Sequence, residues 1–307
     1  MKRGLITWDK SEIAPDVFAG RVDGVRRTLA ERGLSALVVY SDLWRSNQAR
    51  YFSNYMPYFN RALLIVPTEF SPTLLCGLSP RVYGWIRSVT TIEDVRAAGD
   101  FAKPLFQLAV ERNWARVGAL DLDQLPYDIN KAIRSGSLEV GNVESSAVFS
   151  PDGDASELTV RRKAAAMAEE ILMDELPKAV GSVDHHFVGR LERRFRRAGA
   201  EDLITLISNG RAVPAPPTGA KLEENYSVSA AMEYRGHWVR VSRPHAPPQV
   251  FEQCKKLALG EAQQRAALVV EKLDGGYPYE IGTGTIRAVH VEFEYNGKRL
   301  FYGDTIL

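Results

Sequence analysis

Residues 227–243 read SVSAAMEYRGHWVRVSR, and their pattern decides the fold of the C-terminal half. Two runs, 227–234 and 237–243, carry β-branched and aromatic residues, and Gly236 lies between them. Such residues favour extended backbone, and glycine accepts the positive φ that a tight turn requires. We therefore predict two strands that are joined by a hairpin.

Helices and further strands surround this hairpin in the predicted C-terminal half. Apolar residues at helical spacing predict one helix after Ser156, which we expect to be its N-cap, and a second helix from about Ser182. The dipeptide Asn296-Gly297 is a hairpin signal between two more strands. The third predicted helix spans 252–273, and the last predicted strands span 285–294 and 299–307.

The N-terminal half alternates between helical and strand patterns, which predicts a mixed or parallel sheet with helices packed on it. Turn-forming and acidic residues cluster at 150–154, so we place the boundary there, between domain 1–150 and domain 151–307. The predicted fold class is therefore α/β in two domains. The predicted helices are 17–29 and 103–114, and the predicted strands are 34–40, 61–67, 72–77, 116–121 and 138–143.

Composition and charge exclude several classes of partner. The 307 residues carry a net charge of +1, so the overall charge favours neither nucleic acid nor an anionic membrane as a partner. No stretch approaches the ~18 apolar residues of a membrane span, and the first residues lack the apolar core of a secretory signal. Cys76 and Cys254 are the only cysteines, which fits a reducing compartment. We expect a cytoplasmic protein.

The usual nucleotide, serine-hydrolase and zinc motifs are missing from the sequence. It has no glycine-rich loop ending in Lys-Ser or Lys-Thr and no Gly-x-Ser-x-Gly, and its two cysteines lie far apart. His185 and His186 are adjacent on a predicted helix and point in different directions, so we interpret them as surface histidines. We interpret the arginines that follow as a solvated basic face; they are Arg190, Arg193, Arg194, Arg196 and Arg197.

Two histidines on predicted strands, His237 and His290, are the candidates for chemistry. His290, Glu292 and Glu294 alternate, so their side chains leave the strand on one face. His290 with Glu292 beside it fits a proton-transfer pair. A half-exposed strand with a polar outer face explains the same pattern, and the sequence alone leaves both interpretations open.

Carboxylates are scarce where a metal centre would need them. No aspartate occurs between Asp202 and Asp274, across the strands that would form a catalytic floor. A centre with two metal ions needs several carboxylates converging on ions about 3.5–4 Å apart. We therefore expect no such centre in this half.

Several stretches resemble the creatinase, prolidase and aminopeptidase P superfamily, the pita-bread proteins. The resemblance implies a creatinase-like N-terminal α/β domain, a pita-bread C-terminal domain, and a homodimer in which the N-terminal domain reaches the partner's site. The stretches that carry it are 21–40, 47–55, Phe59-Asn60-Arg61, Ser156-Glu157-Leu158, 222–243 and 303–307.

Most members of this superfamily hold two metal ions with two Asp, one His and two Glu, and the sequence departs from that set. The first Asp position falls near Ser229 or Ala231, and the second falls at Arg240. The Glu positions fall at His290 and Gly303, and the segment of the ligand His is reduced to a short loop, 274–280. The resemblance therefore implies a protein without metal ligands and without a cofactor.

Creatinase, within this superfamily, cleaves a C–N bond without a metal. It uses a His acid/base, glutamates that bind a guanidinium group, and a Phe-x-Arg motif from the other subunit that grips a carboxylate. Phe59-Asn60-Arg61 matches that motif, and Arg61 could bind a carboxylate through two hydrogen bonds. The other parts do not match, because the His position falls within 214–216 and a Glu position at Ser242, so creatine is not the expected substrate.

Two hypotheses about function follow from these observations. The first is a metal-independent, creatinase-like hydrolase or lyase that acts on a C–N bond of a small carboxylated nitrogenous substrate. Its catalytic residues would be His290 as acid/base and Glu292 as its orienter. The second hypothesis is a non-catalytic member that binds a peptide or a small ligand. In the first, the substrate-binding residues would be His237, Arg240 and Arg243, with Phe59 and Arg61 from the partner subunit.

Overall fold

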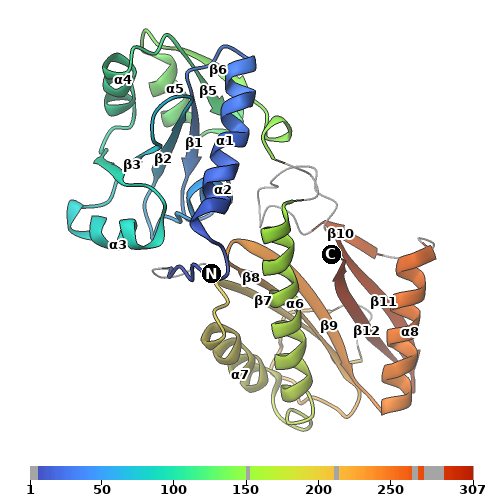
Figure 1. Ribbon diagram of the computed structural model, residues 1–307. Coiled ribbons are helices and arrows are strands. Elements are labelled where there is room, and N and C mark those ends of the chain that lie inside the picture. Colours follow the sequence, from blue (N-terminus) through green and yellow to red (C-terminus); the bar gives the residue numbers. More distant parts are fainter. Residues whose placement is uncertain (1–5, 150–152, 211–213, 265–268, 273–286, 307) are drawn as a thin grey trace. The chain divides into compact units, whose positions relative to one another are not determined.

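The computed structural model describes residues 6–149, 153–210, 214–264, 269–272 and 287–306. These residues form two compact units, one before residue 150 and one after residue 152. Each unit has its own six-stranded sheet, and Figure 1 labels their elements. Among the described residues, none of the helices has both the length and the apolar character that a membrane crossing demands.

The N-terminal unit is built on a mixed sheet with the strand order β4-β3-β2-β1-β5-β6. The central strand β1 pairs antiparallel with β2 and parallel with β5, which confirms the predicted mixed sheet. The strands are β1 (Ala36–Ser41), β2 (Ala62–Pro67), β3 (Thr73–Cys76), β4 (Asp94–Ala97), β5 (Arg116–Leu120) and β6 (Glu139–Val143).

Helices cover both faces of this sheet, which explains why β1 is apolar along its length (Figure 1). Leu37 and Val39 face a core that α1 and α2 share, whereas Val38 and Tyr40 face a core that α4 and α5 share. A strand that is buried on both faces has a continuous apolar run instead of an alternating pattern. The helices are α1 (Pro15–Glu31), α2 (Asn47–Ser53), α3 (Tyr83–Val89), α4 (Ala102–Glu111) and α5 (Tyr127–Arg134).

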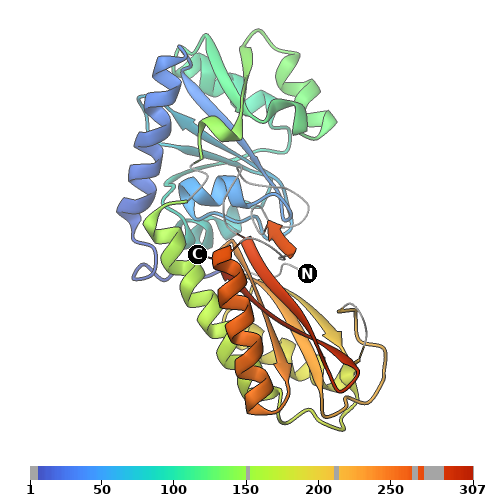
Figure 2. The same ribbon diagram turned by 90° about the vertical axis from the view of Figure 1, so that its right-hand side faces the viewer.

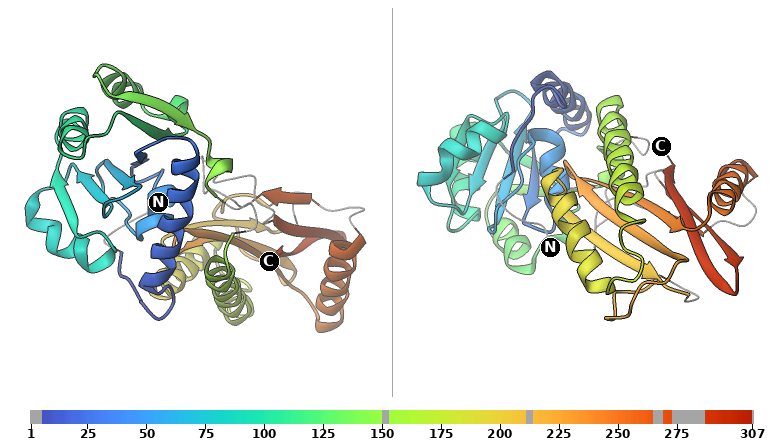
Figure 3. Two further views of the ribbon diagram at one scale, coloured as in Figure 1. Left: turned by 45° about the horizontal axis from the view of Figure 1, so that its top comes forward. Right: turned by 90° about the horizontal axis from the view of Figure 1, so that it is seen from below.

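The C-terminal unit has an antiparallel sheet with the order β10-β11-β12-β9-β8-β7, which Figure 3 shows from two sides. Two of its hairpins turn through a pair of residues with positive φ, Arg235-Gly236 and Asn296-Gly297. This geometry is that of a type I′ turn, and both predicted hairpins are confirmed. The strands are β7 (Asp202–Ser208), β8 (Tyr226–Tyr234), β9 (His237–His245), β10 (Val269–Lys272), β11 (Arg287–Tyr295) and β12 (Lys298–Ile306).

The helices α6 (Ala155–Glu175), α7 (Asp184–Arg197) and α8 (Pro248–Gln264) pack against one face of this sheet. Cys254 of α8 is buried with Tyr302 of β12, and Phe187 of α7 contacts the ring of Tyr226 on β8. The Tyr226 hydroxyl donates to the carbonyl of Leu176, at the end of α6. Figure 2 shows α6 and α8 on the same side of the strands.

The structure corrects the predicted bounds of two helices. Asp154, and not Ser156, caps α6: its carboxylate accepts from the Glu157 N–H at 2.9 Å, and the Glu157 carboxylate accepts from the Asp154 N–H at 2.9 Å. This is a reciprocal capping box. The predicted helix 252–273 is wrong beyond Gln264, because 269–272 form β10 and pair with β11. The predicted short loop 274–280 lies outside the described residues.

Candidate functional site

A row of residues crosses the C-terminal sheet at one level. Ser229 of β8 pairs with Ser242 of β9, Ser242 pairs with Gly303 of β12, and Gly303 pairs with His290 of β11. Residues that are paired across neighbouring strands project from the same face. The side chains of Ser229, Ser242 and His290 therefore share one face, which we call the Ser242 face. It lies opposite the face that α6 and α8 cover, since Tyr302 contacts α8 and is the neighbour of Gly303.

Gly303 allows the His290 ring to reach Ser242. Alternate strands of a sheet lie roughly 10 Å apart, so a side chain on the strand between them would separate the two residues. With no side chain at 303, Nδ1 of His290 lies 3.3 Å from Oγ of Ser242. The Ser242 hydroxyl in turn donates to the Ser229 hydroxyl at 2.9 Å, and both serines are buried. The three side chains form one polar chain, in which both serines are buried and His290 is half-buried.

Arg240 brings positive charge to the Ser242 face, two residues before Ser242 on β9. Thr305 fixes its backbone, because the Arg240 N–H donates to the Thr305 hydroxyl at 2.8 Å and that hydroxyl donates to the Arg240 carbonyl at 3.0 Å. Burial lowers the pKa of the Arg240 guanidinium. Burial also lowers the pKa of His290 to about 4, with Arg240 adding to the effect and Asp304 opposing it. The His290 imidazole is therefore neutral near pH 7.

The hydrogen bonds determine which nitrogen of His290 is basic. Because the Ser242 hydroxyl gives its hydrogen to Ser229, its oxygen acts as an acceptor toward His290. Nδ1 then carries the ring hydrogen, and Nε2 holds the lone pair. The arrangement can accept a proton at Nε2 beside a buried positive charge.

Arg243 has a different role from the predicted one. Its side chain is 1% exposed and lies on the helix-covered face. Its guanidinium donates to the Gly303 carbonyl at 2.7 Å, to Asp304 at 2.6 Å and to Glu169 of α6 at 2.9 Å, and it stacks on Tyr302. Burial lowers the pKa of Arg243, but the nearby Asp304 and Tyr302 outweigh burial and the net shift is upward. Arg243 therefore ties α6 to β12, on the face of the sheet opposite His290.

Glu292 and His237 also differ from their predicted roles. Glu292 is exposed, and its carboxylate accepts from the Arg299 guanidinium of β12 at 2.6 Å, so Ser242 takes the place of the predicted orienter of His290. His237 begins β9, and its Nδ1 lies 3.8 Å from the Glu157 carboxylate of α6. Strand alternation puts His237 on the helix-covered face, so the sheet separates it from His290.

Phe59 and Arg61 lie in the N-terminal unit, just before β2. The Phe59 ring is 69% exposed and packs edge-on against Tyr58. Nη1 of Arg61 lies 2.7 Å from the Asp128 carboxylate of α5, and this hydrogen bond raises the pKa of Arg61. Both side chains are accessible within their unit, and their role in a partner's site stays a prediction.

The residues of the Ser242 face do not fit a pair of divalent metal ions. The resemblance assigns four ligand positions to described residues, namely Ser229 or Ala231, Arg240, His290 and Gly303, and all of them lie on this one face. They offer one imidazole, one hydroxyl, one cation and no carboxylate, whereas two-metal sites require several carboxylates. In the part of the chain that the structure describes, no three His, Cys, Asp or Glu side chains are grouped to hold a metal ion.

Sequence reasoning missed the role of Ser229 and Ser242. A signal was present, because the two serines stand at equal distances on either side of the Arg235-Gly236 turn. Hairpin pairing through a two-residue turn therefore predicts that they lie opposite each other. The contact with His290 carries no such signal, since it depends on the register of β12.

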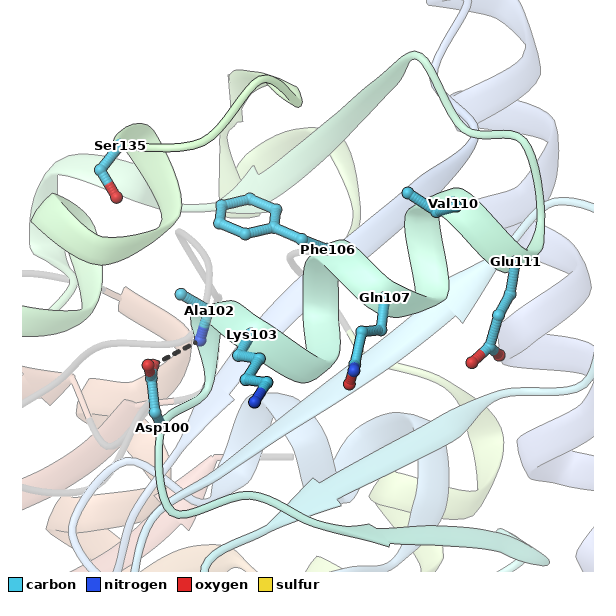
Figure 4. A pocket seen from close by; sticks show the side chains of 8 residues that line it. All are labelled: Asp100, Ala102, Lys103, Phe106, Gln107, Val110, Glu111 and Ser135. Atoms are coloured by element: carbon cyan, nitrogen blue, oxygen red, sulfur yellow. Dashed lines mark hydrogen bonds between the residues drawn. The ribbon is translucent and has the colours of Figure 1, made fainter.

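A separate hollow of about 670 Å³ lies on the surface of the N-terminal unit along α4 (Figure 4). Phe106 and the exposed Val110 line it, with Ser135 on the opposite wall. At its rim Asp100 accepts from the Ala102 N–H at 3.0 Å, which begins α4. None of the predicted site residues lines this hollow.

Comparisons with known proteins agree with this architecture. Residues 21–150 match the Creatinase/Prolidase N-terminal domain family. No curated protein sequence matches the chain with significance. The prolidase of Pyrococcus horikoshii OT3 is similar in structure, with a TM-score of 0.67 and 14% identity over 94% of this chain and 95% of that one.

Two further solved structures show the same similarity. The Xaa-Pro dipeptidase of Bacillus anthracis has a TM-score of 0.67 and 15% identity over 94% of each chain. The X-Pro aminopeptidase of Thermotoga maritima MSB8 has a TM-score of 0.68 and 14% identity over 93% of this chain and 94% of that one. Identities this low establish the shared fold and leave the activity to be argued from the site.

Proposed function

Since the chain belongs to the creatinase, prolidase and aminopeptidase P superfamily, with its N-terminal domain and its pita-bread fold, we propose that it is a metal-independent hydrolase or lyase. The substrate would be a small carboxylated nitrogenous compound that is cleaved at a C–N bond. One observation carries the proposal: His290 contacts the Ser242–Ser229 pair on the Ser242 face, with Arg240 close enough to lower its pKa.

His290 would act as a general base through Nε2. Its imidazole removes a proton from a water molecule as the water oxygen bonds to the carbon of the C–N bond. The imidazolium then returns that proton to the leaving nitrogen, which restores the neutral ring. Ser242 supports this cycle by accepting from Nδ1–H, which holds the ring in the tautomer whose Nε2 is basic.

Arg240 and Arg61 would bind the negative charge of the substrate. The guanidinium of Arg240 shares the Ser242 face with His290, and it would bind a substrate carboxylate through two parallel hydrogen bonds. In a homodimer the partner subunit's Phe59 and the partner subunit's Arg61 would close the site. Arg61 can exchange its exposed ion pair with Asp128 for a substrate carboxylate at little cost, because exposed pairs contribute about 0–1 kcal/mol.

The proposal is tested by amine release from a panel of N-amidino, N-carbamoyl and N-acyl amino acids, with protein freed of metals by a chelator. We expect turnover of at least one compound that persists after chelation. His290→Ala and His290→Asn should abolish it, whereas His186→Ala, which changes an exposed histidine elsewhere, should not. Turnover that disappears with the metals, or that survives both His290 changes, would rule the proposal out.

A non-catalytic binding protein is the second candidate, and the burial of Ser242 favours it. Ser242 is fully buried, so the polar chain could stabilise the sheet without meeting a substrate. A binding protein would show thermal stabilisation by peptides or by carboxylated compounds and no product from any of them. His290→Ala would then change stability alone.

A further inference from the structure

A second cluster of basic residues lies on α7, in the C-terminal unit. His185, His186, Arg190 and Arg193 surround Gly189 and line a hollow of about 490 Å³. We infer that this hollow binds the phosphate group of a small molecule. The site is independent of the Ser242 face and of the reaction proposed there.

Helix geometry brings these side chains together over Gly189. His185 and Arg193 stand four residues before and after Gly189, and His186 stands four residues before Arg190, so all lie on adjoining rows of one helix face. Long side chains on a helix lean toward its N-terminus, so both arginines extend back toward the histidines. Gly189 has no side chain, and a Cβ placed there would meet nothing within 4 Å. The bare backbone of Gly189 therefore forms the floor of the hollow.

Carboxylates neutralise Arg190, Arg194 and Arg196 of α7, whereas Arg193 in the hollow and Arg197 outside it have no ion pair in the described part of the chain. Five arginines occur in the eight residues 190–197, and like charges at this spacing destabilise a helix. Glu175 lies 3.4 Å from Arg190 and 2.8 Å from Arg194, and further acidic residues pair with Arg196. Within the described part of the chain, the side chains of His186 and Arg193 have no hydrogen-bond or ion-pair partner. An anion in the hollow would supply the missing negative charge.

Phosphate is the anion that these donors fit best. Guanidinium groups bind phosphate oxygens through two parallel hydrogen bonds, and histidines add further donors. The hollow is larger than a phosphate ion, so a phosphate monoester on a small organic body fits the space better than free phosphate.

Calorimetric titration of the full chain with phenyl phosphate and with inorganic phosphate tests the inference. We expect Arg193→Gln to weaken binding by about tenfold or more, as the loss of a charge-assisted pair does. Arg197→Gln is the matched control, because Arg197 is an exposed arginine of the same helix outside the hollow. Tighter binding of phenyl phosphate would identify a phosphorylated molecule as the ligand, and equal binding would identify free phosphate.

Gly189→Leu separates occupancy of the hollow from folding. Leucine is a better helix former than glycine and has open space here, so the variant should be at least as stable as the wild type. It should nevertheless lose binding, because its side chain fills the floor of the hollow. Undetectable binding to the wild type, equal losses in the two arginine variants, or full binding to Gly189→Leu would overturn the inference.

Discussion

The low pKa of His290 predicts a specific loss of stability in mild acid. An unfolded histidine binds a proton as the pH falls below about 6.5, whereas burial and Arg240 hold folded His290 neutral until about pH 4. Between these values the unfolded chain binds more protons, so stability falls as the pH falls. Over the whole interval the difference between the two pKa values lowers the free energy of unfolding by roughly 3 kcal/mol. Above pH 6.5 His290 contributes nothing to the pH dependence of stability.

His290→Asn isolates this effect, because asparagine does not titrate and its amide can keep the contact with Ser242. Urea unfolding should be followed by hydrogen exchange in β9 and β11, which reports the C-terminal unit alone. Between pH 6.5 and pH 4 the free energy of unfolding should fall by roughly 3 kcal/mol more in the wild type than in the variant. Parallel pH profiles for the two proteins would show that His290 titrates normally and would refute the buried, cation-flanked geometry.

Three further changes test the packing of the two units by thermal and urea unfolding. Arg243→Met should lower the free energy of unfolding by roughly 3 kcal/mol, because it leaves the buried Gly303 carbonyl unpaired and removes the bonds to Asp304 and Glu169. Arg61→Met, at an exposed ion pair, should lower it by less than about 1 kcal/mol, and similar losses would contradict the burial of Arg243. Asp154→Ala should lower the free energy of unfolding by about 1 kcal/mol because the capping box is lost, and Ser156→Ala should not change it measurably. A larger loss in Ser156→Ala than in Asp154→Ala would identify Ser156 as the cap. Gly189→Ala should raise stability by roughly 1 kcal/mol, and a decrease would mean that the helix surface there is not open.

The sequence predicts those elements whose signals are local. The apolar run of β1 and the Asn296-Gly297 turn are decided by nearby residues, and both were predicted correctly. The end of α8 was not, because the helical pattern continues past Gln264 while pairing with β11 draws 269–272 into a strand. There tertiary pairing overrides local propensity.

The candidate site was predictable only in part for the same reason. The sequence points to His290 and Arg240 as candidates because their residue types are conspicuous on predicted strands, and their roles stay predictions. The roles of Ser242, Arg243 and Glu292 depend on which face each side chain takes and on what lies two strands away. Such facts follow from register, which a single sequence does not determine for strands that are distant in the chain.

The register of β12 makes a turn remote from the site responsible for its chemistry. Asn296-Gly297 sets how β11 and β12 align, and that alignment puts the bare backbone of Gly303 between His290 and Ser242. A slip of one residue between β11 and β12 would put the Asp304 carboxylate between His290 and Ser242, in the place of Gly303. Asp304 would then lose its ion pair with Arg243. A carboxylate beside the imidazole favours the protonated ring, so the pKa of His290 would rise. A two-residue turn thus selects the protonation state of a side chain that it never touches.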